Sequence, residues 1–478
     1  MDFFRYLPVK KDELSKFVVV SLMMLMILFI YSIERTVKDT IVVNEMGAEL
    51  ISAIKLFGTL PVAILVMLIY AKLSSEINKT IIFHLFNTLF ISYFLIFTFF
   101  INPDIELFHI DLSVQKQQYP HFKFVISIIE NWSYSLYFTL AELWGSVMLS
   151  LMFWQTANQV FKINQAKRLY PLFGLVAQLG MIMSGELLRF FSNKNLFKGG
   201  WKESLTYINI SVLVAGIVLS FLYWILSNIL VSNSIINAET KKKNKKKINF
   251  VDGLKHVFTS PYIGFITLLI LCYGISINIV EGLWKAQAAV VYLNKQDYAR
   301  FMANLQTYTG IASMVAMLFG SYILSKFSWR ISALVTPIAI LITGAIFFSF
   351  SIYQFQITKM APFLTVAPIV IAVFIGLLQN ILGKSAKYAF FDATKEMAYI
   401  PLSEELKSKG KAAAEVIGGR LGKSGGALIQ QFLLLIIPGS SLINLSSILF
   451  TIFLVIMLCW ILAANLLANE FNLITKNR

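Results

Sequence analysis

The sequence predicts an all-α polytopic membrane protein with twelve transmembrane helices in two pseudo-symmetric six-helix lobes. Three observations support this fold class: the apolar composition, a basic run near the middle of the chain, and a weak internal repeat. Of the 478 residues, 57% are hydrophobic and 14% are charged, whereas a soluble domain has about 25% charged residues. The mean hydropathy of +0.72 agrees with a chain that lies mostly in lipid.

Twelve apolar runs are long enough, at roughly 17–25 residues each, to cross a bilayer as helices. Charged residues lie inside several of these runs, among them the first, fourth, seventh and eleventh. The approximate bounds of the twelve runs are 17–37, 50–73, 79–101, 132–160, 169–191, 205–231, 260–290, 302–325, 331–353, 362–384, 411–437 and 442–468.

Basic residues cluster in alternate loops and predict the topology. Lysines precede the first run, fill the KKKNKKK run at 241–247 and close the chain, whereas three acids lie in the loop at 102–122. Because cytoplasmic loops carry an excess of Lys and Arg, we expect both termini to be cytoplasmic. Lys194, Lys198 and Lys202 are exceptions. The same bias accounts for the net charge of +16, so we expect no nucleic-acid partner.

The start of the chain carries no feature of a cleaved signal or transit peptide, because its apolar run is long and no small-residue cleavage site follows. The composition favours a bacterial inner membrane. The basic run divides the chain into an N-terminal lobe at 1–231, a basic cytoplasmic linker at 232–259 and a C-terminal lobe at 260–478. We expect the linker to be solvated, with some contact to anionic membrane lipid.

A weak internal repeat relates the two lobes. Glu34 and Lys38 in the first run have the same E-x-x-x-K spacing as Glu281 and Lys285 in the seventh. Shorter matches relate the ends of the second and eighth runs, and the segments after the fourth and tenth. Parallel repeats of this kind are typical of two-lobed secondary transporters, whose substrate lies between the lobes near the membrane midplane.

Ionisable residues inside the apolar runs are the functional candidates. Each costs about 2.5–3.5 kcal/mol on insertion scales and usually faces a polar cavity or a partner. They can form salt bridges that lock the bundle, an interpretation that the two E-x-x-x-K pairs favour. Alternatively, converging cations can bind the phosphate oxygens of a polyanion, with the carboxylates keeping the empty site near neutrality. The candidates are Arg35, Lys38, Lys55, Glu142, Glu281, Lys285, Arg420 and Lys423.

Other kinds of site are not indicated. Gly422-Lys423-Ser424 is no P-loop, because the position that needs the first glycine holds Ile417 and the segment opens an apolar helix. The four histidines have no metal-ligand spacing and the two cysteines lie in apolar runs, so we expect no metal, disulfide or cofactor. Four aromatic residues near the charges could stack on a base or simply pack: Tyr134, Tyr137, Trp144 and Trp284.

Several long motifs, spread from Glu34 to the last run, resemble the ATP:ADP translocase family of plastids and obligate intracellular bacteria. The motifs include Ala-Glu142-Leu-Trp-Gly-Ser, Phe153-Trp-Gln-Thr-Ala-Asn-Gln, Tyr170-Pro-Leu-Phe-Gly-Leu, Tyr273-Gly-Ile-Ser-Ile-Asn-Ile-Val-Glu281, Lys395-Glu-Met-Ala-Tyr-Ile-Pro-Leu and Leu421-Gly-Lys423-Ser-Gly-Gly-Ala-Leu-Ile-Gln-Gln.

The resemblance implies a fold like that of the major facilitator superfamily and the exchange of host ATP for bacterial ADP, a form of energy parasitism. It also implies that four charged positions, Lys55, Glu142, Glu281 and Lys423, matter for transport. Family members differ, since some carry GTP, CTP or UTP and some import nucleotide with a proton. The sequence lacks the N-terminal targeting extension of plastid members, which favours a bacterium.

These observations give one main hypothesis and two alternatives. The main hypothesis is a monomeric antiporter that binds ATP and ADP, with phosphate as a further candidate ligand, and that works by alternating access. A membrane enzyme acting on a phosphorylated lipid or nucleotide would need a nucleophile, a base or paired metal-binding acids, and no such constellation is evident in the sequence. A carrier of other anions, such as sugar phosphates, is the third possibility.

Overall fold

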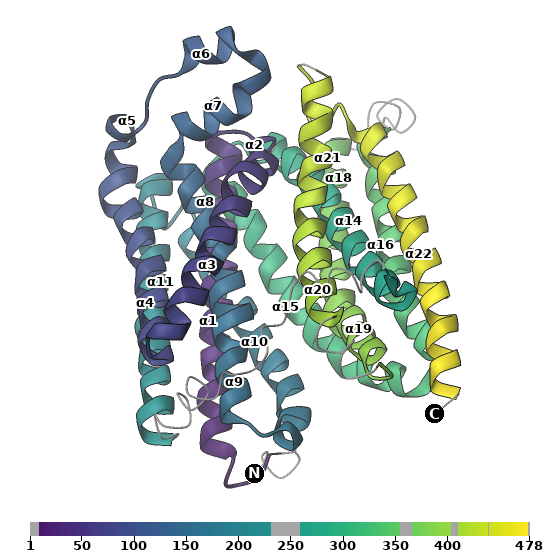
Figure 1. The fold of residues 1–478 in the computed structure, drawn as a ribbon. Coiled ribbons are helices and arrows are strands. Elements are labelled where there is room, and N and C mark those ends of the chain that lie inside the picture. The colour runs from purple at the N-terminus through teal and green to yellow at the C-terminus, as the bar shows by residue number, and fades with distance from the viewer. Residues whose placement is uncertain (1–8, 231–258, 354–365, 403–409, 438, 477–478) are drawn as a thin grey trace. The chain divides into compact units, whose positions relative to one another are not determined.

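Helices make up all the regular structure in the part of the chain that the computed structural model describes, residues 9–230, 259–353, 366–402, 410–437 and 439–476. In these ranges, eleven helices are long and apolar enough to cross a membrane (Figure 1). The remaining predicted span, 411–437, consists of consecutive helical segments whose apolar part is the shorter Ser424–Ile436. The all-α polytopic class is therefore confirmed, and the count of twelve spans is approximate.

The chain forms two compact units. Within the described ranges, the first unit contains residues 9–46, 57–230 and 294–311, and the second contains 47–56, 259–293 and 312–476. The second predicted span is therefore shared, since its start at 47–56 belongs to the second unit. The eighth predicted span is also divided between the units: its start, up to residue 311, belongs to the first unit and the rest to the second. The lobe bounds drawn from the sequence, 1–231 and 260–478, stay a prediction.

The first unit is an α-helical bundle, and several of its helices contain π-helical turns. Its elements are α1 (Leu14–Glu45), α3 (Leu60–Glu76), α4 (Lys79–Ile96), η3 (Phe97–Ile101), η4 (Asn102–Asp104), α5 (Ile105–Phe108), α6 (Ser113–Gln118), η5 (Pro120–Phe122), α7 (Lys123–Glu130), α8 (Trp132–Trp144), η6 (Gly145–Phe153), α9 (Trp154–Val160), α10 (Ile163–Phe191), α11 (Gly200–Ile225), η7 (Leu226–Leu230) and the first half of α15 (Lys295–Lys326).

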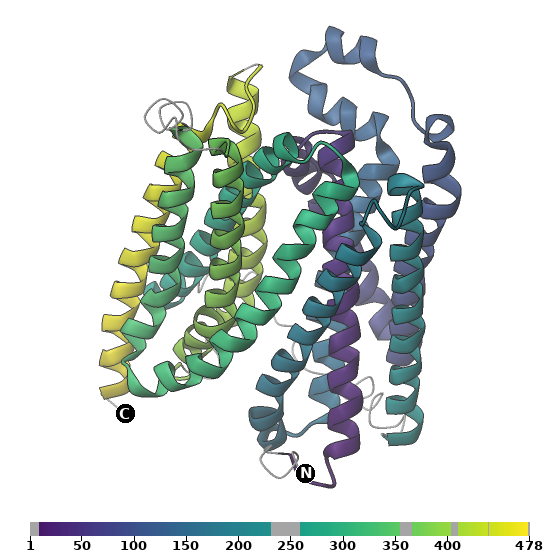
Figure 2. The ribbon, with the colours of Figure 1, turned by 180° about the vertical axis from the view of Figure 1, so that it is seen from behind.

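Helix α1 is the central helix of the first unit and packs along α10 and α11 (Figure 2). It continues to Glu45, well past residue 37, where the apolar run was expected to end. Within this extension, the hydroxyls of Thr36 and Thr40 are satisfied by hydrogen bonds that they donate to carbonyls four residues earlier, at 3.1 and 2.8 Å. The charged residues of the first span therefore lie inside this helix and not at its end.

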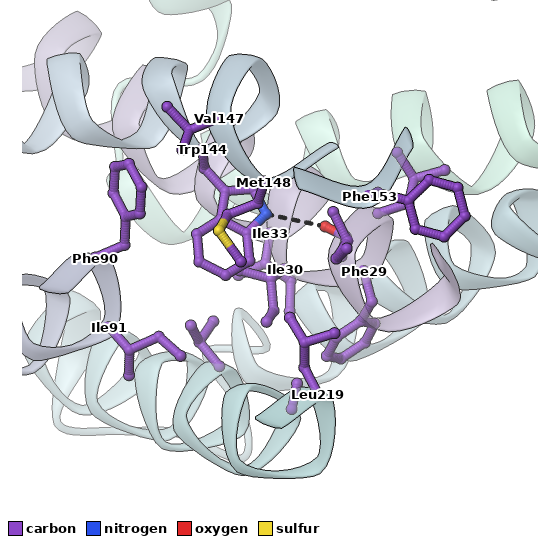
Figure 3. Close-up of a cluster of buried hydrophobic side chains, with 14 of the residues drawn as sticks. Phe29, Ile30, Ile33, Phe90, Ile91, Trp144, Val147, Met148, Phe153 and Leu219 are labelled. Atoms are coloured by element: carbon purple, nitrogen blue, oxygen red, sulfur yellow. Dashed lines mark hydrogen bonds between the residues drawn. The ribbon is translucent and has the colours of Figure 1, made fainter. Parts of the chain in front are cut away.

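Trp144 anchors α8 against α1 in the core of the first unit (Figure 3). Its ring is fully buried, and its indole N–H donates a hydrogen bond to the carbonyl of Ile27 at 3.1 Å. The ring of Phe90 meets it edge to face, with centroids 5.6 Å apart. Of the two roles considered for this residue, packing is the one the geometry supports. The anchor also fixes the position of Glu142, two residues earlier on α8.

The second unit is a second helical bundle. Its elements are α2 (Leu50–Ala53), the first part of η2 (Ile54–Thr59), α14 (Pro261–Val291), the second half of α15, α16 (Trp329–Ile352), α18 (Pro368–Ala386), η9 (Lys387–Phe391), α19 (Asp392–Tyr399), α20 (Lys411–Val416), η11 (Ile417–Leu421), α21 (Gly422–Ile436) and α22 (Ser446–Lys476). Helix α14 is its central helix and packs on α18, α21 and α22 (Figure 1).

Three glycines spaced four residues apart bring η11 and α21 close to α14. A Cβ atom on Gly418 would lie 2.7 Å from the Cβ of Ile270, and one on Gly422 would lie 3.2 Å from the Cα of Gly274. Gly426 continues the same stripe. Small residues at such spacing let membrane helices approach closely. The prediction that the glycines around Lys423 serve close helix packing is therefore supported.

We expect Gly426→Ala to lower the free energy of unfolding by about 1–3 kcal/mol, because overpacking strains a close interface. The new Cβ would lie 2.6 Å from the Cβ of Asn278. Gly419→Ala is the matched control: nothing lies within 4 Å of its added Cβ, and alanine favours helix more than glycine does. Thermal unfolding of the purified variants measures both effects, and equal melting temperatures would contradict the close packing.

Candidate functional site

A polar pocket in the second unit is the first candidate site. Its cavity volume is ≈ 10 Å³, and its walls come from α2, η2, α14 and α21. We call it the lysine pocket. It is lined by Ile51, Ser52, Lys55, Asn278, Glu281, Gly282, Lys285, Ala427 and Gln430. Three of the eight residues selected from the sequence, Lys55, Glu281 and Lys285, therefore share one pocket.

Lys55 reaches this pocket from a π-helical turn and is held by a short relay of amides. Its ammonium group donates a hydrogen bond to the side-chain oxygen of Asn278 at 2.7 Å. The Asn278 amide in turn donates to the carbonyl of Gly274, and the side chain of Gln430 donates to the carbonyl of Asn278, both at 2.8 Å. These contacts fix the rotamer of Asn278 and hence its oxygen, which orients the lysine.

Glu281 lies between two lysines. Lys384 of α18 contacts one carboxylate oxygen at 2.6 Å, and Lys285, one turn along α14, approaches the other at 3.8 Å. All three side chains are at most 8% exposed. Lys55 lines the same pocket as Glu281, so the described side chains of this group include three lysines and one glutamate. A buried excess of cations is stabilised by an anion with several acceptor oxygens.

A second charge cluster lies in the first unit around Lys38. Its ammonium group contacts Asp39 at 2.9 Å and Glu142 at 3.3 Å, and it lies 3.7 Å from the centroid of the Phe138 ring. The lysine is almost fully buried, whereas Glu142 is partly accessible. The two acids and the aromatic face stabilise the buried cation. Two more predicted site residues, Lys38 and Glu142, are therefore direct partners.

Glu34 does not pair with Lys38, although the two lie one turn apart. Its carboxyl group accepts a hydrogen bond from the hydroxyl of Tyr137 at 2.6 Å. The two E-x-x-x-K motifs thus have different surroundings: the carboxylate of Glu281 contacts two lysines, and that of Glu34 contacts a phenol. The interpretation of such spacing as a salt bridge therefore fits Glu281 and Lys285 but not Glu34 and Lys38.

The other three predicted site residues, Arg35, Arg420 and Lys423, are described by their positions in the helices. Arg35 is half-buried on α1. Arg420 lies in η11 and Lys423 in the first turn of α21, but their side chains lie outside what the structure describes. Lys423 precedes Ala427 by four residues, so its position in the helix is one turn from a residue that lines the lysine pocket.

Three residues of the site were not selected from the sequence. Lys384 stands in an apolar run, which is the signal that identified the other lysines, but its pairing with Glu281 joins positions 103 residues apart. Asn278 and Gln430 are neutral, and single amides in an apolar run carry little sequence signal. Among the described residues, no group of three or more His, Cys, Asp or Glu side chains could hold a metal ion.

Comparison with known proteins identifies relatives across nearly the whole chain. The ADP,ATP carrier protein 1 of Rickettsia prowazekii (strain Madrid E) is 40% identical over 482 residues, which cover 98% of this chain and 96% of that protein. The ADP,ATP carrier protein 3 of Rickettsia felis (strain ATCC VR-1525 / URRWXCal2) is 41% identical over 472 residues, covering 95% and 94%.

Solved structures of transporters share the fold at low sequence identity. A D-xylose–proton symporter superposes with a TM-score of 0.57 at 12% identity, covering 96% of this chain and 97% of that one. A nucleoside transporter superposes with a TM-score of 0.55 at 11% identity, covering 96% and 99%. These likenesses establish a major-facilitator-like fold. A family model described as TLC ATP/ADP transporter matches residues 3–471, and the chain therefore belongs to the TLC ATP/ADP transporter family.

Proposed function

We propose that the protein is a secondary antiporter that exchanges external host ATP for internal ADP by alternating access. The observation that carries the proposal is the lysine pocket, which Lys55 and Lys285 line beside the buried carboxylate of Glu281, itself in contact with Lys384. Phosphate oxygens accept charge-assisted hydrogen bonds from lysine, so a nucleotide polyphosphate complements this charge. The names of the relatives, ADP,ATP carrier proteins, support the same substrates.

In this proposal, Lys55, Lys285 and Lys423 bind the phosphates, with Arg420 and Arg35 adding positive charge. The cavity at the lysine pocket, ≈ 10 Å³, has room for about one water molecule, far below the roughly 300–1,000 Å³ of sites for drug-sized ligands. We therefore expect the pocket to widen when the phosphate end of the nucleotide enters it. Glu281 and Glu142 hold the cations of the empty carrier, and through their pairing with lysine they couple its two conformations.

The charge also supplies a reason for obligatory exchange. Excess buried cations are costly to carry through a closed state unless an anion neutralises them. A carrier of this kind changes conformation readily only when loaded, because the substrate stabilises the closed state more than the open ones. The protein then acts as a carrier and not as an enzyme, and it needs no cofactor.

The location follows from the same proposal. The eleven apolar helices make the chain a multi-pass membrane protein. The Rickettsia relatives and the basic loops support the inner membrane of a bacterium, with both termini in the cytoplasm. We further propose that the carrier is a monomer and that anionic lipid contacts its basic loops.

A competition panel in proteoliposomes tests the substrate class. We expect unlabelled ATP and ADP to suppress the uptake of labelled ATP into ADP-loaded vesicles more strongly than GTP, CTP, UTP or sugar phosphates do. Stronger competition by another nucleotide would reassign the base preference, and stronger competition by a sugar phosphate would overturn the nucleotide proposal. Hydrolysis of ATP by the purified protein would favour the enzyme alternative, and dependence of uptake on a proton gradient would favour proton-coupled import.

A further inference from the structure

Glu34 of α1 is the most enclosed carboxyl group that the proposed transport site does not use. Its relative exposure is 0%. One oxygen, Oε2, accepts the hydrogen bond from Tyr137, and the other, Oε1, is buried without a hydrogen-bond partner. An ionised carboxylate has room for about four hydrogen bonds and is strongly destabilised when buried without them.

The second E-x-x-x-K motif, at Glu281 and Lys285, shows which partners surround an ionised buried glutamate in this protein. The side chain of Glu281 is also buried, but a lysine contacts each of its two carboxylate oxygens. Around Glu34 the corresponding lysine, Lys38, contacts Asp39 and Glu142 instead. Environments that differ in this way push two carboxyl groups towards opposite protonation states.

The hydrogen bonds beyond Glu34 accommodate a protonated carboxyl group, because the Tyr137 hydroxyl has both the side-chain oxygen and the amide nitrogen of Asn209 near it, at 3.4 and 3.3 Å. The hydroxyl of Tyr137 lies 3.4 Å from the side-chain oxygen of Asn209, whose amide donates a hydrogen bond to the hydroxyl of Thr98 at 2.6 Å. Thr98 in turn donates to the carbonyl of Phe94 at 2.8 Å. If Glu34 donates its proton to the Tyr137 oxygen, the phenol can donate to Asn209, and each hydroxyl in the series has both a donor and an acceptor.

The elements packed against α1 bring no cation to Glu34 among the described side chains. Helix α8 contributes Tyr137 and Glu142, and the latter pairs with Lys38. Segments η6 and η7 contain no ionisable residue. Helix α15 contacts α1 where Gln306 donates a hydrogen bond to Thr36; its Lys295 pairs with Glu45 and its Arg300 is exposed. The charged residues of α10 and α11 whose partners the structure gives are engaged elsewhere: Arg168 with Glu13, Arg189 with Glu186, and Glu203 with the backbone N–H of Gly199.

The remaining charged residue near Glu34 in the sequence is Arg35, which follows it directly on α1. Successive residues of an α-helix point about 100° apart, so the two side chains leave α1 in different directions. Lys202, in the first turn of α11, is exposed, and it lies seven residues before Asn209 in the same helix. Two helical turns therefore separate it from the network.

We propose that Glu34 is a proton-binding site, whose carboxyl group carries a proton in this conformation of the first unit. The proton is the ligand, Tyr137 accepts its hydrogen bond, and Asn209 and Thr98 orient the phenol. The proposal adds a proton to the ligands of the carrier and does not depend on which anion is transported.

Infrared spectroscopy of the purified protein in lipid, without nucleotide, tests the proposal. We expect the wild type to show a carboxylic-acid C=O band that shifts in heavy water and that Glu34→Gln removes. Tyr137→Phe should move the same band to higher frequency, because the carboxyl group loses a hydrogen-bond partner. Glu13→Gln is the matched control and should leave this band unchanged, since the carboxylate of Glu13 pairs with Arg168 outside the proposed transport site.

A wild-type spectrum identical to that of Glu34→Gln in this region would overturn the proposal. Glutamine has the shape of the neutral acid, so we expect this variant to fold with a melting temperature close to that of the wild type. Should it fail to fold, Glu34→Asp serves in its place, with a shifted band supporting a protonated carboxyl and an unchanged band opposing it. Because no nucleotide is present, failure of this test and failure of nucleotide exchange are separate results.

Discussion

Replacing Glu281 with glutamine will lower the free energy of unfolding by about 3–5 kcal/mol, the usual effect of removing one partner of a buried ion pair. The carboxylate contacts Lys384 at 2.6 Å and Lys285 at 3.8 Å, and all three side chains are nearly inaccessible. The variant leaves two buried ammonium groups without this acid. Thermal unfolding of the purified protein measures the loss, and we expect coupled exchange to be lost as well.

The double variant Glu281→Gln/Lys384→Met separates stability from transport. It removes the shorter ion pair as a whole, and an apolar side chain of similar length replaces the lysine, so we expect most of the lost stability to return. Exchange should stay lost, because the carboxylate that couples the conformations is still missing. If Glu281→Gln alone melts at the wild-type temperature, the bridging role assigned to this carboxylate is wrong.

Replacing Lys55 with methionine will weaken nucleotide binding about 10–100-fold. A hydrogen bond to a charged group contributes roughly 1.5–3 kcal/mol, and each 1.4 kcal/mol is a factor of ten in affinity. Lys55 lines the pocket and its ammonium group is already oriented by Asn278 at 2.7 Å. The concentration of ATP that half-saturates exchange in ADP-loaded proteoliposomes measures the effect.

Two further lysine variants serve as controls for Lys55→Met. Lys55→Arg keeps the charge but replaces a compact ammonium group with a planar fork, so we expect partial activity. Lys72→Met removes an exposed lysine near the end of α3, outside the lysine pocket, and should leave exchange unchanged. If Lys55→Met and Lys72→Met behave alike, Lys55 does not bind the phosphates.

The charged residues of the pocket could be found in the sequence because ionisable side chains are rare inside apolar runs. That signal alone selected Lys55, Glu281 and Lys285, which share one pocket. It could not assign partners. Lys384 and Glu281 are 103 residues apart in the sequence, and Lys55 and Asn278 are 223 apart, so these contacts form only when the helices pack.

The repeated E-x-x-x-K spacing shows the limit of local pattern most clearly. Spacing of four residues places both side chains on one helix face but does not decide what each contacts. On α14 the glutamate gains a lysine from α18, whereas on α1 Glu34 meets Tyr137 from α8. Helix α1 also extends past the expected bound at residue 37, and the charges there, Lys38 and Asp39, pair within the bundle.

Counter-exchange is the most direct test of the central claim that this carrier switches only when loaded. Labelled ATP is presented to proteoliposomes that contain the purified protein and that are either loaded with ADP or empty. We predict rapid uptake into the loaded vesicles, matched by the exit of ADP, and little uptake into the empty ones. Equal uptake into both would contradict obligatory exchange, and with it the role proposed here for the buried cations.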